Sequence, residues 1–310
     1  MSSTGSGMPY RSAIASLVAP TAAPRRLAGG FQFTEGPVWV PQERALLFSD
    51  IPADARWRWS PDRGLELVAR PTAKGNGMCL DADGALIVCE HLSSTVSRVR
   101  DGRREVIAFH YEGRYLNSPN DAAMRAADGS IYFTDPAYGR EDAWVGLLRA
   151  RELDFQGVYR IPPTGGELEL LVEPGEFEAP NGLCFSPDQG LLYVNDTARG
   201  VIAAFDVVQD GSLSGRRIIH RHQSRGWPHE GVFDGMECDE RGNIWVSGPG
   251  GVWVISPEGE RLGILETPEI CVSLAWGGPD LHTLFLMTTT TIHAVETLVG
   301  PAPLPSTPRS

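Results

Sequence analysis

One short phrase recurs six times along this chain: a polar residue, usually followed by Gly or Asp, and then a short apolar run. Its six copies begin at Glu35, Asn76, Asn120, Asn181, Asp234 and Ser273. Successive copies lie 39 to 61 residues apart, which is the length of a four-stranded blade with its loops. Repetition at that period predicts a six-bladed β-propeller. Because each innermost strand of a propeller lines the central channel, the six polar residues should converge on one axis.

Strand-like runs bounded by turn residues fill each repeat, as up-and-down antiparallel sheets require. The second repeat, for example, reads NGMCLDADG, ALIVCEH, TVSRVR and REVIAF. The sixth repeat is one strand short when it reaches Val295, and we expect the segment around residues 13–27 to supply that strand. The predicted fold is therefore all-β: a six-bladed β-propeller of four-stranded antiparallel blades, with the ring closed by an N-terminal strand.

The 310 residues are predicted to form a single propeller domain over residues 13–298. We expect a flexible leader over residues 1–12 and a flexible tail over residues 299–310. An insertion in the third repeat, roughly residues 141–155, is expected over one end of the channel.

The formal net charge of -12, with Lys74 the one lysine, argues against negatively charged partners. Nucleic acids and anionic membranes bind basic surfaces, so we expect neither as a partner. No apolar stretch reaches the length of a transmembrane helix, and the five cysteines form no CxxC pair. We predict a cytoplasmic protein, a monomer or small homo-oligomer, whose partner is a small molecule.

Four residues of the predicted ring offer only oxygen donors: Glu35, Asn120, Asn181 and Asp234. Carboxylates and carboxamides suit a hard divalent cation, so we expect one metal ion, first Ca²⁺, with Mg²⁺, Mn²⁺ or Zn²⁺ as alternatives. Asn-Gly and Asp-Gly pairs also form turns, which explains any single copy without a ligand. Six copies pointing at one axis favour a metal site.

Several longer motifs identify a family resemblance. They are TEGPVW at 34–39, NSPND at 117–121, FTDPAYG at 133–139, APNGLCFSPD at 179–188, LLYVNDT at 191–197 and DGMECDERGNIWV at 234–246. In this order they resemble the gluconolactonase, regucalcin (senescence marker protein) and diisopropyl fluorophosphatase group of six-bladed propellers. The chain is most similar to the bacterial sugar-lactone lactonases of that group, and the likeness extends from about Phe31 to Val295.

The resemblance implies a catalytic divalent metal held by Glu35, Asn181 and Asp234. It also implies that Asn120 is a fourth ligand or contacts water and substrate. Three features depart from the family: Ser118 replaces an arginine that binds the sugar in regucalcin-like members, Ser273 replaces an asparagine found in many lactonases, and the stretch WPHE at 227–230 is unlike the usual pattern. These differences concern the substrate, and none of them involves an implied metal ligand.

We therefore expect a metal-dependent hydrolase that opens the ring of a lactone, foremost an aldonolactone such as a gluconolactone. Asp234 is the expected base or proton carrier, with Asn120 as the second catalytic residue. The expected substrate contacts are Asn76, His91, Ser118, Asp121, Tyr138 and Ser273. For His91 a proton shuttle and a purely structural hydrogen bond stay open, and Tyr138 and Trp227 are candidates for the pocket wall. The alternatives are an organophosphate hydrolase of the same family or a non-catalytic binding propeller.

Overall fold

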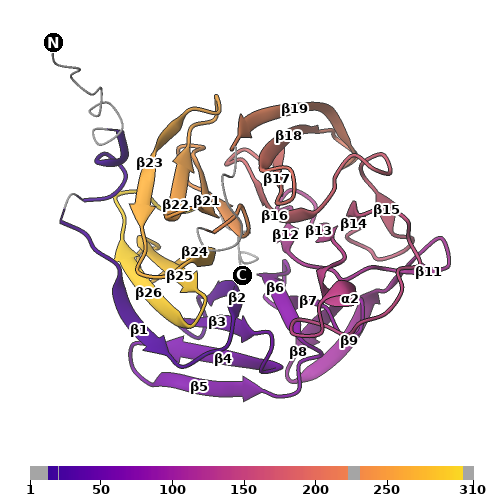
Figure 1. Cartoon of the computed structure of the whole chain (residues 1–310), viewed down its shortest axis with the longest axis horizontal. Coiled ribbons are helices and arrows are strands. Elements are labelled where there is room, and N and C mark those ends of the chain that lie inside the picture. Colours follow the sequence, from indigo (N-terminus) through magenta and orange to yellow (C-terminus); the bar gives the residue numbers. More distant parts are fainter. Residues whose placement is uncertain (1–12, 20, 223–230, 303–310) are drawn as a thin grey trace, which may run out of the picture.

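The computed structural model describes residues 13–19, 21–222 and 231–302. Six four-stranded antiparallel sheets surround a central axis, so the predicted six-bladed, all-β propeller is confirmed (Figure 1). The innermost strands are β2 (Thr34–Val40), β6 (Gly75–Leu80), β12 (Ala122–Met124), β16 (Pro180–Phe185), β20 (Met236–Cys238) and β24 (Cys271–Gly277).

The outer strands follow the same order in every blade. The second strands are β3 (Ala45–Asp50), β7 (Leu86–Glu90), β13 (Ile131–Asp135), β17 (Leu191–Asp196), β21 (Ile244–Gly248) and β25 (Thr283–Thr288). The third strands are β4 (Ala55–Ser60), β8 (Thr95–Arg100), β14 (Gly157–Ile161), β18 (Val201–Val207), β22 (Gly251–Ile255) and β26 (Thr291–Glu296). The outermost strands are β5 (Gly64–Ala69), β9 (Arg103–Ala108), β15 (Glu169–Leu170), β19 (Leu213–Arg221), β23 (Arg261–Glu266) and β1 (Arg25–Gly29).

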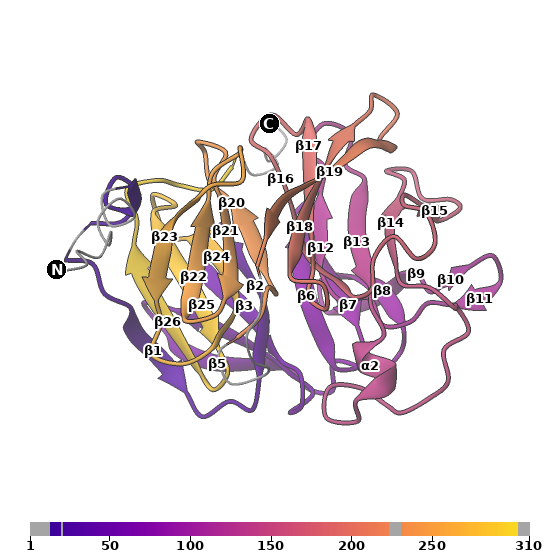
Figure 2. The ribbon, with the colours of Figure 1, turned by 45° about the horizontal axis from the view of Figure 1, so that its top comes forward.

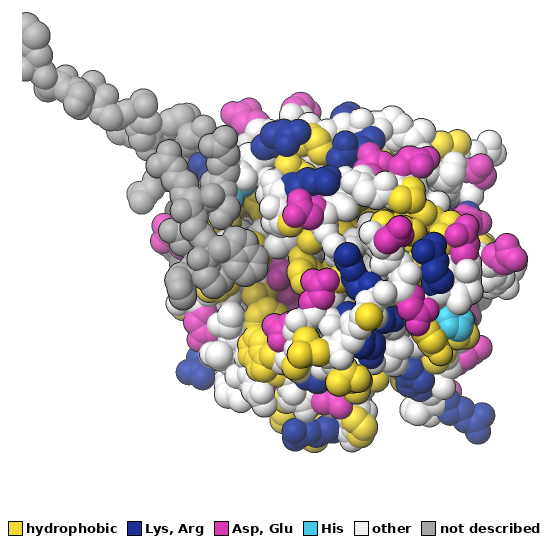
Figure 3. Space-filling model, turned by 45° about the vertical axis from the view of Figure 1, so that its right-hand side comes forward, with side chains coloured by type: hydrophobic (Ala, Val, Ile, Leu, Met, Phe, Trp, Pro, Cys, Tyr) yellow, Lys and Arg dark blue, Asp and Glu magenta, His cyan; other side chains and the backbone are white. Residues whose placement is uncertain are grey.

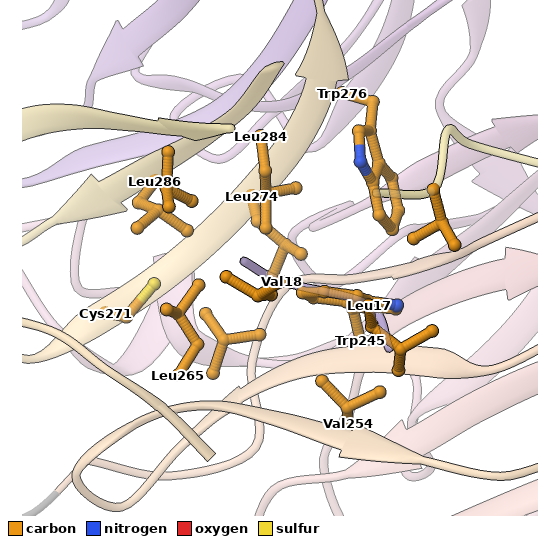
Figure 4. Packing of buried hydrophobic residues seen from close by; sticks show 13 residues of the cluster. Leu17, Val18, Trp245, Val254, Leu265, Cys271, Leu274, Trp276, Leu284 and Leu286 are labelled. Carbon is orange, nitrogen blue, oxygen red and sulfur yellow. The ribbon is translucent and has the colours of Figure 1, made fainter. Parts of the chain in front are cut away.

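The ring closes where the N-terminal β1 pairs with β26, near the end of the chain, from Arg25 with Ala294 to Gly29 with Thr291, with a register shift between Arg26 and Ala28. The predicted closing strand exists, but its predicted position, around residues 13–27, was too early. Leu17 and Val18 lie outside β1: Val18 forms an isolated antiparallel bridge with Thr297, and both side chains fill an apolar gap between blades 5 and 6 (Figure 4). Burying them there removes more apolar surface from water than an outer strand position would.

The predicted flexible tail starts too early at residue 299. Val299 is fully buried, Pro301 bridges Asp239, and the Ala302 N–H donates to the Cys238 carbonyl at 2.7 Å. Residues 299–302 therefore add to the inner edge of blade 5. The predicted leader, residues 1–12, and residues 303–310 lie outside the described residues.

The core is divided among the interfaces between neighbouring blades. Each of six apolar clusters is built from two adjacent blades. Trp39 of blade 1, for example, stacks on Phe285 of blade 6 with ring centroids 5.6 Å apart. Because each sheet is covered on both faces, its strands need not alternate apolar and polar residues. All five cysteines are free, and four of them are buried.

The insertion in blade 3 begins with a short helix, α2 (Tyr138–Glu141), which projects from one end of the propeller (Figure 2). We call the following residues, 142–150, the strap. Trp144 of the strap lies 5.4 Å from Phe33, just before β2, and Lys74, just before β6, donates to the strap backbone. The strap therefore covers blades 1 and 2 at the end where inner strands begin. A small hairpin, β10 (His110–Tyr111) and β11 (Arg114–Tyr115), joins blades 2 and 3.

Charged side chains of both signs intermingle on the surface (Figure 3). Arg58, for instance, pairs with Glu43 at 2.8 Å and with Glu66 at 3.0 Å. Such half-exposed pairs stabilise a fold only slightly. Within the described residues, no helix is both long enough and apolar enough to cross a bilayer.

Candidate functional site

The six repeated polar residues lie at equivalent places around the channel. Glu35, Asn76, Asn181 and Ser273 stand at or near the start of inner strands, and Asn120 and Asp234 come two residues before one. Backbone hydrogen bonds join neighbouring copies: the Gly77 N–H donates to the Asn120 carbonyl, and the Gly235 N–H to the Val272 carbonyl, both at 2.8 Å. The structure thus brings the predicted residues into one ring, which we call the polar ring.

The glycine after a ring residue is required by this close approach. A Cβ at Gly36 would lie 2.0 Å from the Asn76 carbonyl oxygen, and one at Gly182 would lie 2.2 Å from the Asp234 carbonyl oxygen. No side chain fits at such distances. The Glu-Gly, Asn-Gly and Asp-Gly pairs therefore follow from packing of one inner strand against the next, and not from turns.

Aspartates that end second strands hold the loops leading into the ring. Each accepts backbone N–H groups two or three residues before a ring residue. Asp50 bonds Gln32 and Phe33, Asp135 bonds Asn117, and Asp196 bonds Glu178 and Ala179. The sequence analysis missed this role, although the recurring SD, TD and ND pairs at strand ends were a readable signal.

Two carboxylates of the polar ring, those of Glu35 and Asp234, interact electrostatically; Glu35 is buried and Asp234 is partly exposed. Burial raises the pKa of Glu35 well above its usual range and the nearby Asp234 raises it further, while a hydrogen bond from the Gly36 N–H lowers it. Burial likewise raises the pKa of Asp234 to about 7, against a hydrogen bond from the Asn181 amide that lowers it. The pair needs a cation or a proton to offset its mutual repulsion.

Asn181 completes an oxygen-rich set with these carboxylates. The Thr197 hydroxyl donates to the Phe233 carbonyl at 2.6 Å, so it accepts from Asn181 Nδ2 at 3.0 Å. That orientation leaves Asn181 Oδ1 as a possible metal ligand. The described residues include no group of three His, Cys, Asp or Glu side chains arranged to hold a metal. The donors at the axis are two carboxylates and amides, a set that fits a hard divalent ion.

Asn120 is held by its backbone, and its side chain is left for the site. Its N–H donates to the Thr134 carbonyl at 2.9 Å, and its carbonyl accepts from Gly77. Ser273 lies beside Glu35, whose pKa its hydroxyl lowers through a hydrogen bond. Asn76 Nδ2 lies 3.1 Å from His91 Nε2, which places His91 directly behind the ring.

The remaining predicted contacts are distributed on both sides of the ring. The Tyr138 hydroxyl, from α2, is buried beside Asn181 and Thr197 without a well-formed hydrogen bond to the described residues. Ser118 is fully buried, and its hydroxyl donates to the Pro136 carbonyl at 2.6 Å while accepting from the Gly139 N–H at 2.9 Å. Ser118 therefore supports α2.

Asp121 points into the channel behind the polar ring. A cavity of about 250 Å³ there is lined by Asp121, Glu237, Ser273 and the side chains of inner strands. Burial raises the pKa of Asp121 to about 7 and that of Glu237 to about 8. Sequence reasoning did not single out Glu237. Trp227 lies outside the described residues.

Fold and site together define a six-bladed propeller with an axial, oxygen-lined site covered on one side by an inserted strap. The sequence model of the SMP-30/gluconolactonase/LRE-like region matches residues 33–291, and the chain belongs to this family. The resemblance seen in the motifs is thereby confirmed.

Named relatives support the same membership. A gluconolactonase of Zymomonas mobilis is 32% identical over 87% of this chain and 80% of its own length. Pentonolactonase XacC of Haloferax volcanii is 31% identical over 82% of this chain and 80% of its own. The structure of a Xanthomonas campestris gluconolactonase superposes with a TM-score of 0.85 at 31% identity, covering 92% of this chain and 93% of that one. A calcium-binding regucalcin from Agrobacterium tumefaciens, at 18% identity and a TM-score of 0.70, shares the fold.

Proposed function

We propose that this protein opens the ring of sugar lactones, foremost an aldonolactone such as a gluconolactone, with the help of one divalent metal ion. The protein is an enzyme of the carboxylic-ester hydrolase class, as its gluconolactonase and pentonolactonase relatives indicate. The observation that carries the metal-dependent part is the Glu35–Asp234 pair of the polar ring, two nearby carboxylates, of which Asp234 raises the pKa of Glu35. Asn181 and Asn120 extend this donor set.

Glu35, Asn181 and Asp234 would hold the ion, with Asn120 as a fourth ligand or as a contact for water. When bound, a divalent ion supplies positive charge that polarises a carbonyl group, and Ca²⁺ suits these donors best. Asp234 can take the proton of an attacking water, because only one of its carboxylate oxygens is needed for a ligand. The Tyr138 hydroxyl, which lies beside Asn181 without a well-formed hydrogen bond to the described residues, would donate a hydrogen bond to the substrate. The strap limits access of water from blades 1 and 2.

Acid release from lactones tests the proposal. Chelator-treated protein, reloaded in turn with Ca²⁺, Mg²⁺, Mn²⁺ and Zn²⁺, should hydrolyse glucono-1,5-lactone and pentonolactones only when a metal is present. Asp234→Ala should abolish turnover, and Asp83→Ala, on an exposed turn, should leave it unchanged. Near-normal activity of Asp234→Ala would eliminate the scheme. Preference for a phosphotriester over every lactone would favour the organophosphate hydrolase instead, and metal-independent ligand binding without turnover would favour a binding propeller.

Cytoplasmic location and a monomeric or small homo-oligomeric state remain predictions. Cell fractionation and light scattering of the purified protein would check them.

A further inference from the structure

His91 lies between the polar ring and the strap, and it engages both. Its side chain is buried, with 2% of its surface exposed. Its Nε2 lies 3.1 Å from Asn76 Nδ2, and its Nδ1 lies 3.1 Å from the Val145 carbonyl oxygen. One imidazole thus links a residue of blade 2 that faces the channel to the backbone of the blade 3 insertion.

The Val145 carbonyl is held in place by contacts on both sides of it in the strap. Lys74 Nζ donates to the preceding carbonyl, that of Trp144, at 2.6 Å. On the other side, Gly146 packs so closely on Gly139 that a Cβ at residue 146 would lie 1.8 Å from the Gly139 carbonyl oxygen. The strap therefore presents the Val145 oxygen to His91 at a fixed position.

This contact determines which nitrogen of His91 carries the proton. A carbonyl oxygen only accepts hydrogen bonds, so Nδ1 must be the donor. In a neutral imidazole Nε2 is then an acceptor, and the Asn76 group opposite it must be the NH₂. The Asn76 carbonyl oxygen is consequently turned away from His91. Within the described parts of the chain, no donor is bonded to that oxygen.

The surroundings keep the imidazole neutral. The pKa of His91 is lowered to about 4, chiefly by burial and also by the positive charges of Lys74 and Arg149, against the bond to Val145, which raises it. Arg149 also donates to the His91 backbone carbonyl at 2.9 Å, which fixes the segment that carries the ring. Protonated His91 would have two donors and would no longer accept from Asn76.

We propose that His91 is a positioning residue that holds Asn76 with its carbonyl oxygen toward the channel, where this oxygen accepts a hydrogen bond from a hydroxyl group of the substrate. The inference rests on the proposed lactonase function and adds a determinant of specificity to it. An acceptor fixed in this way favours polyhydroxylated lactones over lactones that carry no hydroxyl group. A rotated amide would present its NH₂ and lose that preference.

Four variants separate positioning from a general structural role. His91→Gln keeps both contacts, since its NH₂ can donate to Val145 and its oxygen can accept from Asn76. His91→Phe and Asn76→Ala remove them. His220→Phe is the matched control, because His220 also bonds a backbone carbonyl, that of Gly259 at 2.9 Å, but from an outer strand of blade 4.

Kinetics with two six-membered lactones give the main readout. For glucono-1,5-lactone, His91→Phe and Asn76→Ala should lower kcat/KM by about tenfold or more, chiefly through KM, as expected for loss of a fixed hydrogen bond. For δ-valerolactone, which has no hydroxyl group, both variants should stay within about twofold of the wild type. His91→Gln and His220→Phe should behave like the wild type on both substrates. Calcium affinity, measured by calorimetry, should be the same in all five proteins.

Nitrogen NMR of ¹⁵N-histidine-labelled protein gives a second readout that needs no activity. The signal that disappears in His91→Gln should be that of a neutral ring protonated at Nδ1. A ring protonated at Nε2 would overturn the proposal, as would equal losses on both lactones or a failure of His91→Gln to restore activity. A wild type inactive on every lactone would refute the proposed function and the hydroxyl acceptor together, while the NMR result would still decide how His91 positions Asn76.

Discussion

Replacing Asp234 by Asn should stabilise the metal-free protein, although it removes a proposed metal ligand. In the folded chain the pKa of Asp234 is raised to about 7 from an ordinary value of 3.8. The folded state therefore binds more protons than the unfolded state between these values, and stability falls as pH rises through that window. Asn carries no charge, so the stability of the variant should not fall in this way as pH rises.

The magnitude follows from the shift. About three pKa units at 1.36 kcal/mol each give about 4 kcal/mol at pH 8, an upper bound because the Asp234 side chain is partly exposed. Unfolding entropies near 2.1 cal/mol/K per residue make this about 6 °C in Tm for 310 residues. The negative charge of Asp234 also raises the pKa of Glu35. Removing that charge therefore stabilises the folded metal-free protein further.

Thermal unfolding at pH 8, in chelator and in excess Ca²⁺, measures both effects. Without metal, Asp234→Asn should melt above the wild type, and the difference should vanish near pH 4. With Ca²⁺ at about 100 times Kd the wild type should gain about 2.7 kcal/mol, and Asp234→Asn little. Asp121→Asn is the matched control, since burial raises the pKa of Asp121 to about 7 as well. It should stabilise the metal-free form and keep the calcium response. A variant that melts below the wild type in chelator would refute the reasoning.

Three further predictions concern the same site. Since the pKa values of Glu35 and Asp234 are raised, metal binding should release protons and weaken as pH falls below about 7, which calorimetry in buffers of different ionisation enthalpy would show. Gly182→Ala should lower the free energy of unfolding, measured in urea, by about 2 kcal/mol or more, because its Cβ would lie 2.2 Å from the Asp234 carbonyl oxygen. Gly190→Ala is the control: the nearest atom to its Cβ would be 3.3 Å away, so it should lower this free energy by less than about 1 kcal/mol. Tyr138→Phe should lower kcat about tenfold with little change in Tm, because its hydroxyl has no well-formed bond to lose; a large drop in Tm would show that the hydroxyl is structural.

The polar ring was predictable because its signal is local and repeated. Four of the six ring residues are followed by the glycine that allows close approach to the next blade: Glu35-Gly36, Asn76-Gly77, Asn181-Gly182 and Asp234-Gly235. The contact between His91 and Val145 joins residues that are 54 positions apart, and it uses a backbone carbonyl. No pattern of side chains in the sequence can therefore predict it. The bonds of Ser118 could not be predicted for the same reason, since its partners, Pro136 and Gly139, are backbone groups.

The closing strand was predicted, but its position was not. Pairing of β1 with β26 depends on register between the two ends of the chain, which periodicity within one repeat does not specify. Leu17 and Val18 are also typical strand residues. They fill an apolar gap that exists only between two folded blades, so the local sequence pattern does not predict their position.

Pairing of β1 with β26 also sets the order in which the protein can be completed on the ribosome. Blades 1 to 5 are each made of consecutive strands and can form as they emerge, but the sixth waits for residue 296. Until then the incomplete ring exposes the apolar faces of its two end blades, which can associate with other chains. A circular permutant with its termini joined and new ends between two blades would make every blade from continuous chain, and it should show less aggregation during synthesis.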